Sequence, residues 1–297
     1  MTERSDGMNT AVAGGLAGAS PGTERGAAAT VARDARLAAA PARRRFAPVR
    51  HSLLFAGRSL TKNRRNPGLL TDALFLPITF LLLFVYLFGG AVSGSTHAYL
   101  QYIFPGVLVM STVLVGMLAT GLSINTDIKK GVFDRFRSLP VSRAAPLAGS
   151  VLGDLVRYAV AVAVLFATGY LLGFRVQTDV PRTLAAIGLS VALGFGMCWI
   201  NVLIGVLIRE EAIVQSVAFI GIFPLAFGTN MAVPTRTLPG WLQAWVKVNP
   251  VSHAVDACRG LLVGGPVAHD AILTLLWSAV FLAVFAPLAV LAYRRRS

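Results

Sequence analysis

The sequence predicts an all-α polytopic membrane protein with six transmembrane helices. Three observations lead to this fold class. The 297 residues are 55% hydrophobic and only 13% charged, whereas soluble domains carry about 25% charged residues. The apolar residues gather in six blocks, each near the roughly 20 residues that cross about 30 Å of hydrocarbon. The basic residues concentrate in the connections on one side of these blocks, as expected for loops that stay in the cytoplasm.

Residues 1–45 consist mainly of Ala, Gly, Thr and Arg and contain almost no large apolar side chains. Such a segment cannot bury enough surface to offset its ordering entropy. We therefore expect a disordered cytoplasmic tail, followed by one membrane domain over residues 46–293. The tail also lacks the continuous apolar core of a signal peptide.

Residues 46–66 predict an amphipathic helix that lies in the inner headgroup plane. Phe46, Val49 and Leu53 begin an apolar stripe, and cations crowd the remaining surface. Cations on such a helix face anionic lipid. The sequence Asn66-Pro67-Gly68 then breaks this interfacial helix and turns the chain into the bilayer.

The six predicted spans cover residues 69–88, 99–124, 146–174, 183–208, 212–233 and 271–293. In the third span, Asp154 and Arg157 lie three residues apart on one helix face. We expect them to pair at the inner boundary, with the first turns of this helix outside the hydrocarbon.

Small and polar residues within the spans predict contacts between helices. Ala159, Ala163 and Ala167 form a stripe that favours close helix packing, and Gly169 and Gly173 repeat the same spacing. Asn201 is expected to form an interhelical hydrogen bond rather than to contact a ligand.

The distribution of Lys and Arg predicts that both termini are cytoplasmic. With the N-terminus inside, 22 of the 27 basic residues lie on the inner side and five on the outer side, as the positive-inside rule requires. The net charge of +14 therefore reflects multi-pass topology in the plasma (inner) membrane, and we expect no nucleic-acid partner.

The long outer connection over residues 234–270 predicts two short helices. Trp241 and Trp245 lie one helical turn apart, which suits the membrane interface. Asn249 precedes Pro250 as a helix cap before a proline at the first helical position, and Gly264-Gly265-Pro266 is a helix stop. We expect an outer re-entrant segment that dips into or lies on the outer leaflet without crossing it. A plain outer loop would leave the apolar and aromatic content of this segment without a reason.

The chain contains no motif for catalysis, cofactor binding or metal binding. It has no phosphate-cradling G-x-x-x-x-G-K-[ST] sequence, and we identify no catalytic, cofactor or metal residue. Cys198 and Cys258 are expected to be packing residues. No acidic residue falls at the centre of a predicted span, which argues against an ion-coupled carrier. The energy for any pumping must therefore come from another source.

The polar stretch Asn125–Arg143 separates the second and third predicted spans. Ile128, Val132 and Phe136 share one face of a short helix, and Pro140 ends it. One interpretation is an ordinary basic cytoplasmic loop. The other is a docking helix, through which a soluble cytoplasmic partner pushes on the spans.

Two motifs resemble one family. Gly131–Arg143, followed by Gly149 and Asp154–Arg157, resembles the permease subunits of ABC type 2 exporters, closest to the daunorubicin/doxorubicin-resistance branch. Leu238–Gln243, Asn249-Pro250 and Asp256–Arg259 are similar to the element before the last span in the same branch. The resemblance covers about residues 46 to 293.

The resemblance implies a permease that pairs with a second permease copy, as a homodimer or heterodimer, and with two ATP-binding-cassette ATPase subunits. ATP and Mg would be held by these subunits, and this chain would bind no cofactor. A coupling helix would meet the ATPase, with its apolar side chains in a groove of the partner. Its residues would be Asp127, Ile128, Lys130, Gly131, Val132, Phe133, Asp134, Arg135, Phe136 and Arg137. The matching outer re-entrant residues are Trp241, Trp245, Asn249, Pro250, Asp256 and Arg259.

The implied function is a membrane-spanning permease, not an enzyme, that exports hydrophobic drugs or antibiotics across the plasma membrane. The substrate path in this family is thought to follow the second and fifth spans at the interface between two permeases. The candidate residues there are Phe104, Met110, Thr112, Met117, Gln215, Phe219, Phe223 and Asn230. Apolar rings with a few hydroxyls and amides suit a large amphipathic compound, but they equally suit helix packing. The alternatives are an exporter of lipid-linked glycans with the same fold, or an immunity or anchoring subunit that does not transport.

Overall fold

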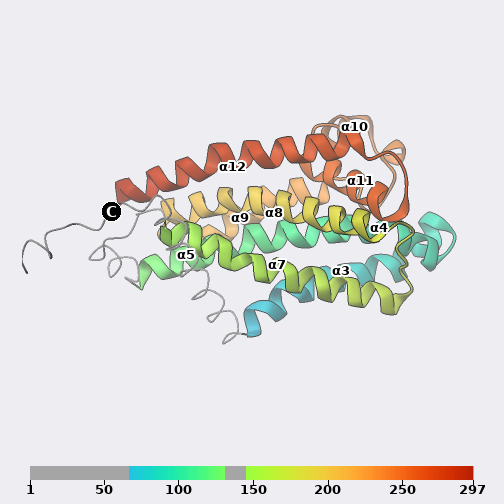
Figure 1. Ribbon diagram of the computed structural model, residues 1–297, viewed down its shortest axis with the longest axis horizontal. Helices are drawn as coiled ribbons and strands as arrows, with labels where there is room; N and C mark the ends of the chain where they lie inside the picture. Colours follow the sequence, from blue (N-terminus) through green and yellow to red (C-terminus); the bar gives the residue numbers. More distant parts are fainter. Residues whose placement is uncertain (1–66, 131–144, 297) are drawn as a thin grey trace, which may run out of the picture. The chain divides into compact units, whose positions relative to one another are not determined.

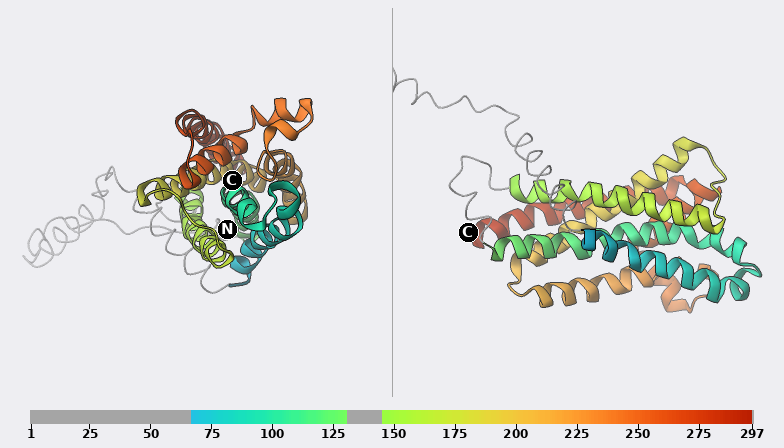
Figure 2. Two further views of the ribbon diagram at one scale, coloured as in Figure 1. Left: turned by 90° about the vertical axis from the view of Figure 1, so that its right-hand side faces the viewer. Right: turned by 90° about the horizontal axis from the view of Figure 1, so that it is seen from below.

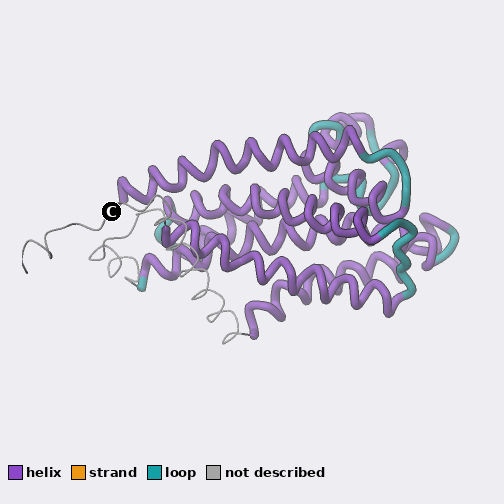
Figure 3. The backbone as a smooth tube through the Cα atoms, in the orientation of Figure 1, coloured by secondary structure: helices purple, strands orange, loops and turns teal. Residues whose placement is uncertain are grey.

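The computed structural model describes residues 67–130 and 145–296. In these ranges every regular element is helical (Figure 3). The predicted tail over residues 1–45, the interfacial helix over 46–66 and most of the coupling helix lie outside the described residues.

Five helical segments are long and apolar enough to cross a membrane. The second of them is an α-helix interrupted by a short π-helix, η1. The segments are α3 (Pro67–Ser93), α4 with η1 and α5 (Thr96–Leu114, Val115–Ala119, Thr120–Lys129), α7 (Ala145–Leu172), α8 (Val180–Leu207) and α12 (Ala268–Arg296). They agree with five of the six predicted spans to within a few residues at each end.

The fifth predicted span is shorter than expected. Helix α9 (Glu211–Phe227) has 17 residues, so it is about 25 Å long at 1.5 Å per residue. The expected helix over residues 212–233 is wrong for its last six residues. Asn249 donates hydrogen bonds to the carbonyls of Leu225 and Gly228 at 2.9 and 3.0 Å. Because these carbonyls bond to a side chain, the helical ladder ends there.

The connection between α9 and α12 contains η2 (Thr235–Thr237), α10 (Gly240–Val246) and α11 (Pro250–Val263). The asparagine-proline cap and the glycine stop act as the sequence predicts. The side chain of Asn249 accepts a hydrogen bond from the Val251 N–H at 2.9 Å. Gly264 ends α11 with a φ of 106°, a conformation that favours glycine.

Helix α8 is the centre of the bundle, where it packs against α4, α5, α11 and α12. Helices α10 and α11 lie at the end of the bundle opposite to the last turns of α12 (Figures 1 and 2). We call the end at which α5, α8 and α12 finish the basic end, because it carries Lys129, Arg209 and Arg295. The approach of α5 to α8 is close, since a Cβ atom on Gly205 would collide with the carbonyl oxygen of Gly121.

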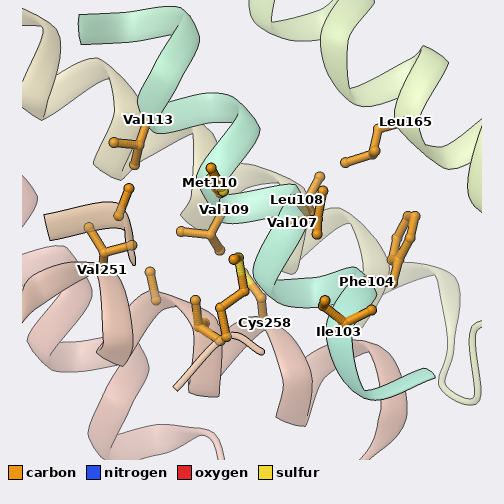
Figure 4. Packing of buried hydrophobic residues seen from close by; sticks show 14 of the residues in the cluster. Ile103, Phe104, Val107, Leu108, Val109, Met110, Val113, Leu165, Val251 and Cys258 are labelled. Atoms are coloured by element: carbon orange, nitrogen blue, oxygen red, sulfur yellow. The ribbon is translucent and has the colours of Figure 1, made fainter. Parts of the chain in front are cut away.

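The largest hydrophobic cluster surrounds α4 and includes α11 (Figure 4). Val251 and Cys258 of α11 pack into it and are fully buried. Helix α11 is therefore part of the core although it is too short to span. Both cysteines are buried and free, as expected for packing residues. Burial raises the pKa of the Cys258 thiol to about 12, so this thiol stays protonated and unreactive.

The small-residue stripe of α7 does not pack within the chain. Ala159, Ala163 and Ala167 are all exposed, so the predicted close packing of this stripe is wrong for the single chain. Close packing is present at Gly169, which the sequence also indicated: a Cβ atom there would clash with the ring of Phe104.

Candidate functional site

A buried ion pair lies on α7 near the basic end of the bundle. Arg157 Nη1 lies 2.9 Å from Asp154 Oδ1, and both side chains are almost fully buried. Thr120 of α5 donates its hydroxyl hydrogen to Asp154 Oδ2 at 2.7 Å. The two residues expected to pair are therefore paired, and their side chains are buried where α7 packs against α5. The pair ties α7 to α5, the helix that leads into the polar stretch.

Only the first part of the proposed coupling helix is described. Asp127 and Ile128 end α5 and Lys130 follows it, whereas Gly131–Arg137 lie outside the described residues. Ile128 is partly buried and packs against the chain's own cluster around Trp199 and Tyr293, so part of its surface is already in contact within the chain. Lys129 contacts Glu211 at 3.6 Å, with both side chains nearly half exposed, a geometry worth about 0–1 kcal/mol.

Two buried amides join the second spanning segment to α8. Asn125 donates hydrogen bonds to the carbonyls of Gly205 and Ile208 at 3.0 and 2.6 Å. In the reverse direction, Asn201 donates to the carbonyl of Met117, within the π-helix η1. The interhelical bond expected of Asn201 is therefore present, and Asn201 contacts no open site.

A polar cluster holds α11 against α4 and the end of α9. Arg259 contacts Asp256 at 2.7 Å, and its guanidinium lies 4.0 Å from the centre of the Tyr102 ring. The Asn230 amide donates to both carboxylate oxygens of Asp256, at 2.7 and 2.8 Å. Burial raises the pKa of the Asp256 carboxyl above its ordinary value of 3.8, while Arg259 and the bond from Asn230 act in the opposite direction.

This polar cluster contains three residues that the sequence singled out, Asn230, Asp256 and Arg259. It also contains Tyr102, which the sequence did not single out. Asn230, a candidate for the substrate path, bonds to the outer segment. Tyr102 was not singled out from the sequence, because only the fold brings it to Arg259. Asn249 and Pro250 are buried, while Trp241 and Trp245 of α10 are exposed, as suits rings at a membrane interface.

The candidate path residues of the second span lie inside the chain. Phe104, Met110, Thr112 and Met117 are each at most 2% exposed. The Phe104 ring stacks on Phe174 with centroids 3.9 Å apart, and the Thr112 hydroxyl donates to the carbonyls of Val109 and Ser190. In the single chain these four residues act in packing.

The candidate path residues of α9 are exposed, in contrast. This helix buries only Val214, Ala218, Ile222 and Ala226, a stripe with a period of four. Gln215, Phe219 and Phe223 lie outside this stripe, and each phenylalanine is about half exposed.

Six phenylalanines form a continuous line of ring contacts from α9 to α3. We call this line the phenylalanine ladder; its members are Phe219, Phe223, Phe227, Phe80, Phe84 and Phe88. Successive ring centroids along it are 5.9, 4.8, 5.4, 6.0 and 5.4 Å apart, all within the 4.5–7 Å range of favourable aromatic pairs.

The sequence contains a signal for the four ladder members that the reasoning missed. Phe80, Phe84 and Phe88 recur at intervals of four residues, as do Phe219, Phe223 and Phe227. Rings at this spacing share one helix face. That the two faces meet through Phe227 and Phe80 follows only from the fold.

Comparison with known proteins assigns the chain to one family. The family model described as ABC-2 type transporter matches residues 52–263. The chain is 43% identical, over 85% of its own length and 89% of the relative's, to the daunorubicin resistance ABC transporter permease protein DrrB1 of Streptomyces coeruleorubidus. It is 29% identical to the probable doxorubicin resistance permease DrrC of Mycobacterium tuberculosis, over 84% and 90% of the two chains.

A more distant relative is a probable multidrug ABC transporter permease, YbhR of Escherichia coli, which is 23% identical over 62% of this chain and 48% of the relative. In such systems ATP is bound by a separate ATPase subunit, and this chain has no P-loop motif of its own. The bundle of long apolar helices and the family match agree, and the chain belongs to the ABC-2 type transporter family as a transmembrane permease subunit of an ABC transporter complex.

Proposed function

We propose that this permease exports hydrophobic, ring-containing drugs or antibiotics, with ATP hydrolysed by its partner ATPase. The phenylalanine ladder carries this proposal. Three crossings (α4 with η1 and α5, α7 and α8) lie between α3 and α9, so α3 and α9 run in the same direction, and the ladder advances in one direction along both. Six rings on a partly exposed face offer successive stacking contacts to an aromatic compound. Phe219 and Phe223 are about half exposed and are therefore the first contacts.

The names of the relatives support the same class of substrate, since they refer to resistance to daunorubicin and doxorubicin. The exposed face of α9 carries few polar groups, chiefly Gln215 and Ser216. Such a face suits aromatic compounds better than the sugar of a lipid-linked glycan, which would need many hydrogen-bonding partners.

We propose six crossings, with both termini in the cytoplasm of the plasma membrane. Helix α9 would form the fifth of these crossings together with residues 228–233, of which Thr229, Asn230 and Met231 are buried. The basic end of the bundle would then face the cytoplasm. Labelling of a single cysteine introduced at Ser297 only from the cytoplasmic side is the expected result, and labelling from outside would reverse the orientation.

The partners follow from the family. We propose that the segment from Asp127 to Arg137 docks on the ATPase, mainly through Val132, Phe133 and Phe136, since Ile128 packs on the chain itself. A second permease copy would face α3 and α9, whose exposed apolar side chains would otherwise meet lipid. The substrate would move between the two permeases along the ladder.

The test uses the permease reconstituted with its ATPase in proteoliposomes, with daunorubicin as the probe. Phe219→Leu/Phe223→Leu keeps the apolar character of α9 but removes two rings. Because each aromatic contact contributes about 0.5–1.5 kcal/mol beyond its area, the concentration for half-maximal stimulation of ATP hydrolysis should rise about 5- to 150-fold. The control Phe281→Leu/Phe285→Leu removes two rings of α12, away from the ladder, and should leave it unchanged.

Unchanged stimulation in the ladder variant would remove the ladder from the substrate path. Two other outcomes identify the alternatives. Stimulation by a lipid-linked glycan but not by the drug would make the chain a glycan exporter. Binding of the ATPase without stimulation by either compound would make it an anchoring or immunity subunit.

A further inference from the structure

The basic end of the bundle contains an open groove of about 600 Å³ between α8 and α12. Its volume falls within the range of about 300–1,000 Å³ that is usual for ligand sites. None of its lining residues belongs to the ladder, the outer polar cluster or the coupling segment. The lining residues are Leu203, Val206, Leu207, Arg209, Leu288, Leu291, Ala292 and Arg295.

The groove is amphipathic: six of its lining residues are apolar, and the other two are arginines. Its wall consists of six apolar side chains from the last turns of two spanning helices, and Leu207 and Leu291 are more than half exposed there. Its two polar members are both cations at the mouth. Arg209 follows the end of α8 by two residues, and Arg295 lies in the last turn of α12. Because α8 and α12 end on the same side of the bundle, both arginines line the groove at its basic end.

Two arginines make one end of the groove basic. Within the described parts of the chain, no ion pair joins Arg209 or Arg295 to a carboxylate, and Glu211 is in contact with Lys129 instead. Glu210 is exposed at the start of α9. The C-terminal ends of α8 and α12 contribute about −0.5 charge each, so the two guanidinium groups exceed these partial charges by about +1, before the exposed and solvent-screened Glu210 is counted.

We propose that this groove binds one anionic phospholipid, with its phosphate between Arg209 and Arg295 and an acyl chain against Leu203, Leu207, Leu288 and Leu291. The wall belongs to spanning helices, so it faces hydrocarbon and is covered by an acyl chain rather than by water. The two arginines then select the headgroup, since guanidinium groups bind phosphate oxygens in pairs. Basic pockets between spanning helices on the cytoplasmic side bind anionic headgroups for the same reason.

The bound lipid would touch the short connection between α8 and α9. Arg209 and Glu210 are the only two residues between Ile208 and the first residue of α9. A lipid phosphate on Arg209 would therefore fix the start of the helix that carries Phe219 and Phe223. The lipid site itself requires only the geometry of α8 and α12, and its test does not depend on the transported drug.

Native mass spectrometry of the full-length permease in detergent tests the proposal directly. The protein is titrated with phosphatidylglycerol and phosphatidylcholine that have identical acyl chains. The wild type should bind phosphatidylglycerol at least tenfold more tightly. Arg209→Gln/Arg295→Gln should abolish this preference, whereas Arg209→Lys/Arg295→Lys should retain most of it. Leu291→Trp fills the groove with both cations intact and should weaken the binding of both lipids severalfold.

The matched control is Arg182→Gln/Arg236→Gln, which removes two exposed cations near the opposite end of the bundle. It should leave the preference for phosphatidylglycerol unchanged. Three outcomes would overturn the site: a full preference in Arg209→Gln/Arg295→Gln, wild-type binding in Leu291→Trp, or displacement of the lipid by millimolar inorganic phosphate. The last outcome would identify a soluble anion as the ligand. A change in oligomeric state without a change in lipid binding would assign the groove to a second copy of the chain.

Discussion

At the scale of single residues, buried polar side chains join the helices at defined points. Asp154, Arg157 and Thr120 link α7 to α5, while Asn125 and Asn201 link the second spanning segment to α8. Interhelical polar contacts in membranes contribute on average about 0.6 kcal/mol each. A buried charge that loses its partner costs far more. We therefore expect substitutions in the ion pair to lower the stability more than substitutions of the two asparagines.

Arg157→Leu should lower the free energy of unfolding by about 3–5 kcal/mol, because it removes the cation 2.9 Å from the buried Asp154 carboxylate. Denaturation by sodium dodecyl sulfate in mixed micelles measures the loss. Asp154→Asn/Arg157→Leu removes both charges and keeps an acceptor for Thr120, so it should recover most of the stability. A double variant no more stable than the single one would show that the uncompensated charge is not the cause.

At the scale of elements, Asn249 connects the end of α9 to the start of α11. Its carbonyl oxygen caps α11, and its amide group bonds to Leu225 and Gly228. One side chain therefore both ends one helix and begins another. The short α9 and the buried α11 depend on the same residue, which explains why the chain after Phe227 leaves the helical path.

Substitutions at Asn249 should separate these two roles. Asn249→Ser keeps an oxygen that can cap α11 but is too short to reach Leu225 and Gly228. It should increase hydrogen exchange only near residues 225–230. Asn249→Ala also removes the cap, at a further cost of about 0.5–2 kcal/mol, and should increase exchange in the first turn of α11 as well. Equal exchange patterns in the two variants would contradict separate roles.

At the scale of the whole molecule, the proposed docking segment would couple the partner ATPase to the spans. The segment that follows α5 joins it to α7, and the ion pair ties these two helices together. A push on this segment would thus reach both helices at once. The docking itself is a proposal from the sequence, because Gly131–Arg137 lie outside the described residues.

Phe136→Ala or Asp134→Lys should leave membrane insertion intact but uncouple ATP hydrolysis from export. Drug-stimulated hydrolysis by the reconstituted complex should fall to the unstimulated rate, while the amount of permease in the membrane stays the same. Leu171→Ala, on an exposed position at the far end of α7, serves as the control and should couple normally. Normal export with full stimulation in both test variants would rule out the docking assignment.

The sequence by itself determined the membrane class, five of the crossings and the caps of α11. These features depend on local composition: a long apolar run needs a bilayer, and an asparagine before a proline begins a helix wherever it lies. The pairing of Asp154 with Arg157 was predictable for the same reason, since residues three apart share one helix face. The four-residue spacing of the phenylalanines was equally visible in the sequence, but the contact between the two sets of rings was not.

Only the tertiary structure decided which faces of the helices meet. It placed Phe104, Met110, Thr112 and Met117 in the core, where they have the packing role that the sequence left open beside a place on the substrate path. It left the alanine stripe of α7 exposed, against what its spacing indicated. In a membrane, the buried and the lipid-facing sides of a helix are both apolar, so no hydrophobic periodicity marks the inward face. The ladder between α9 and α3, and the groove with Arg209 and Arg295, arise between helices far apart in the chain. Their existence depends on how the helices are arranged, which local sequence does not encode.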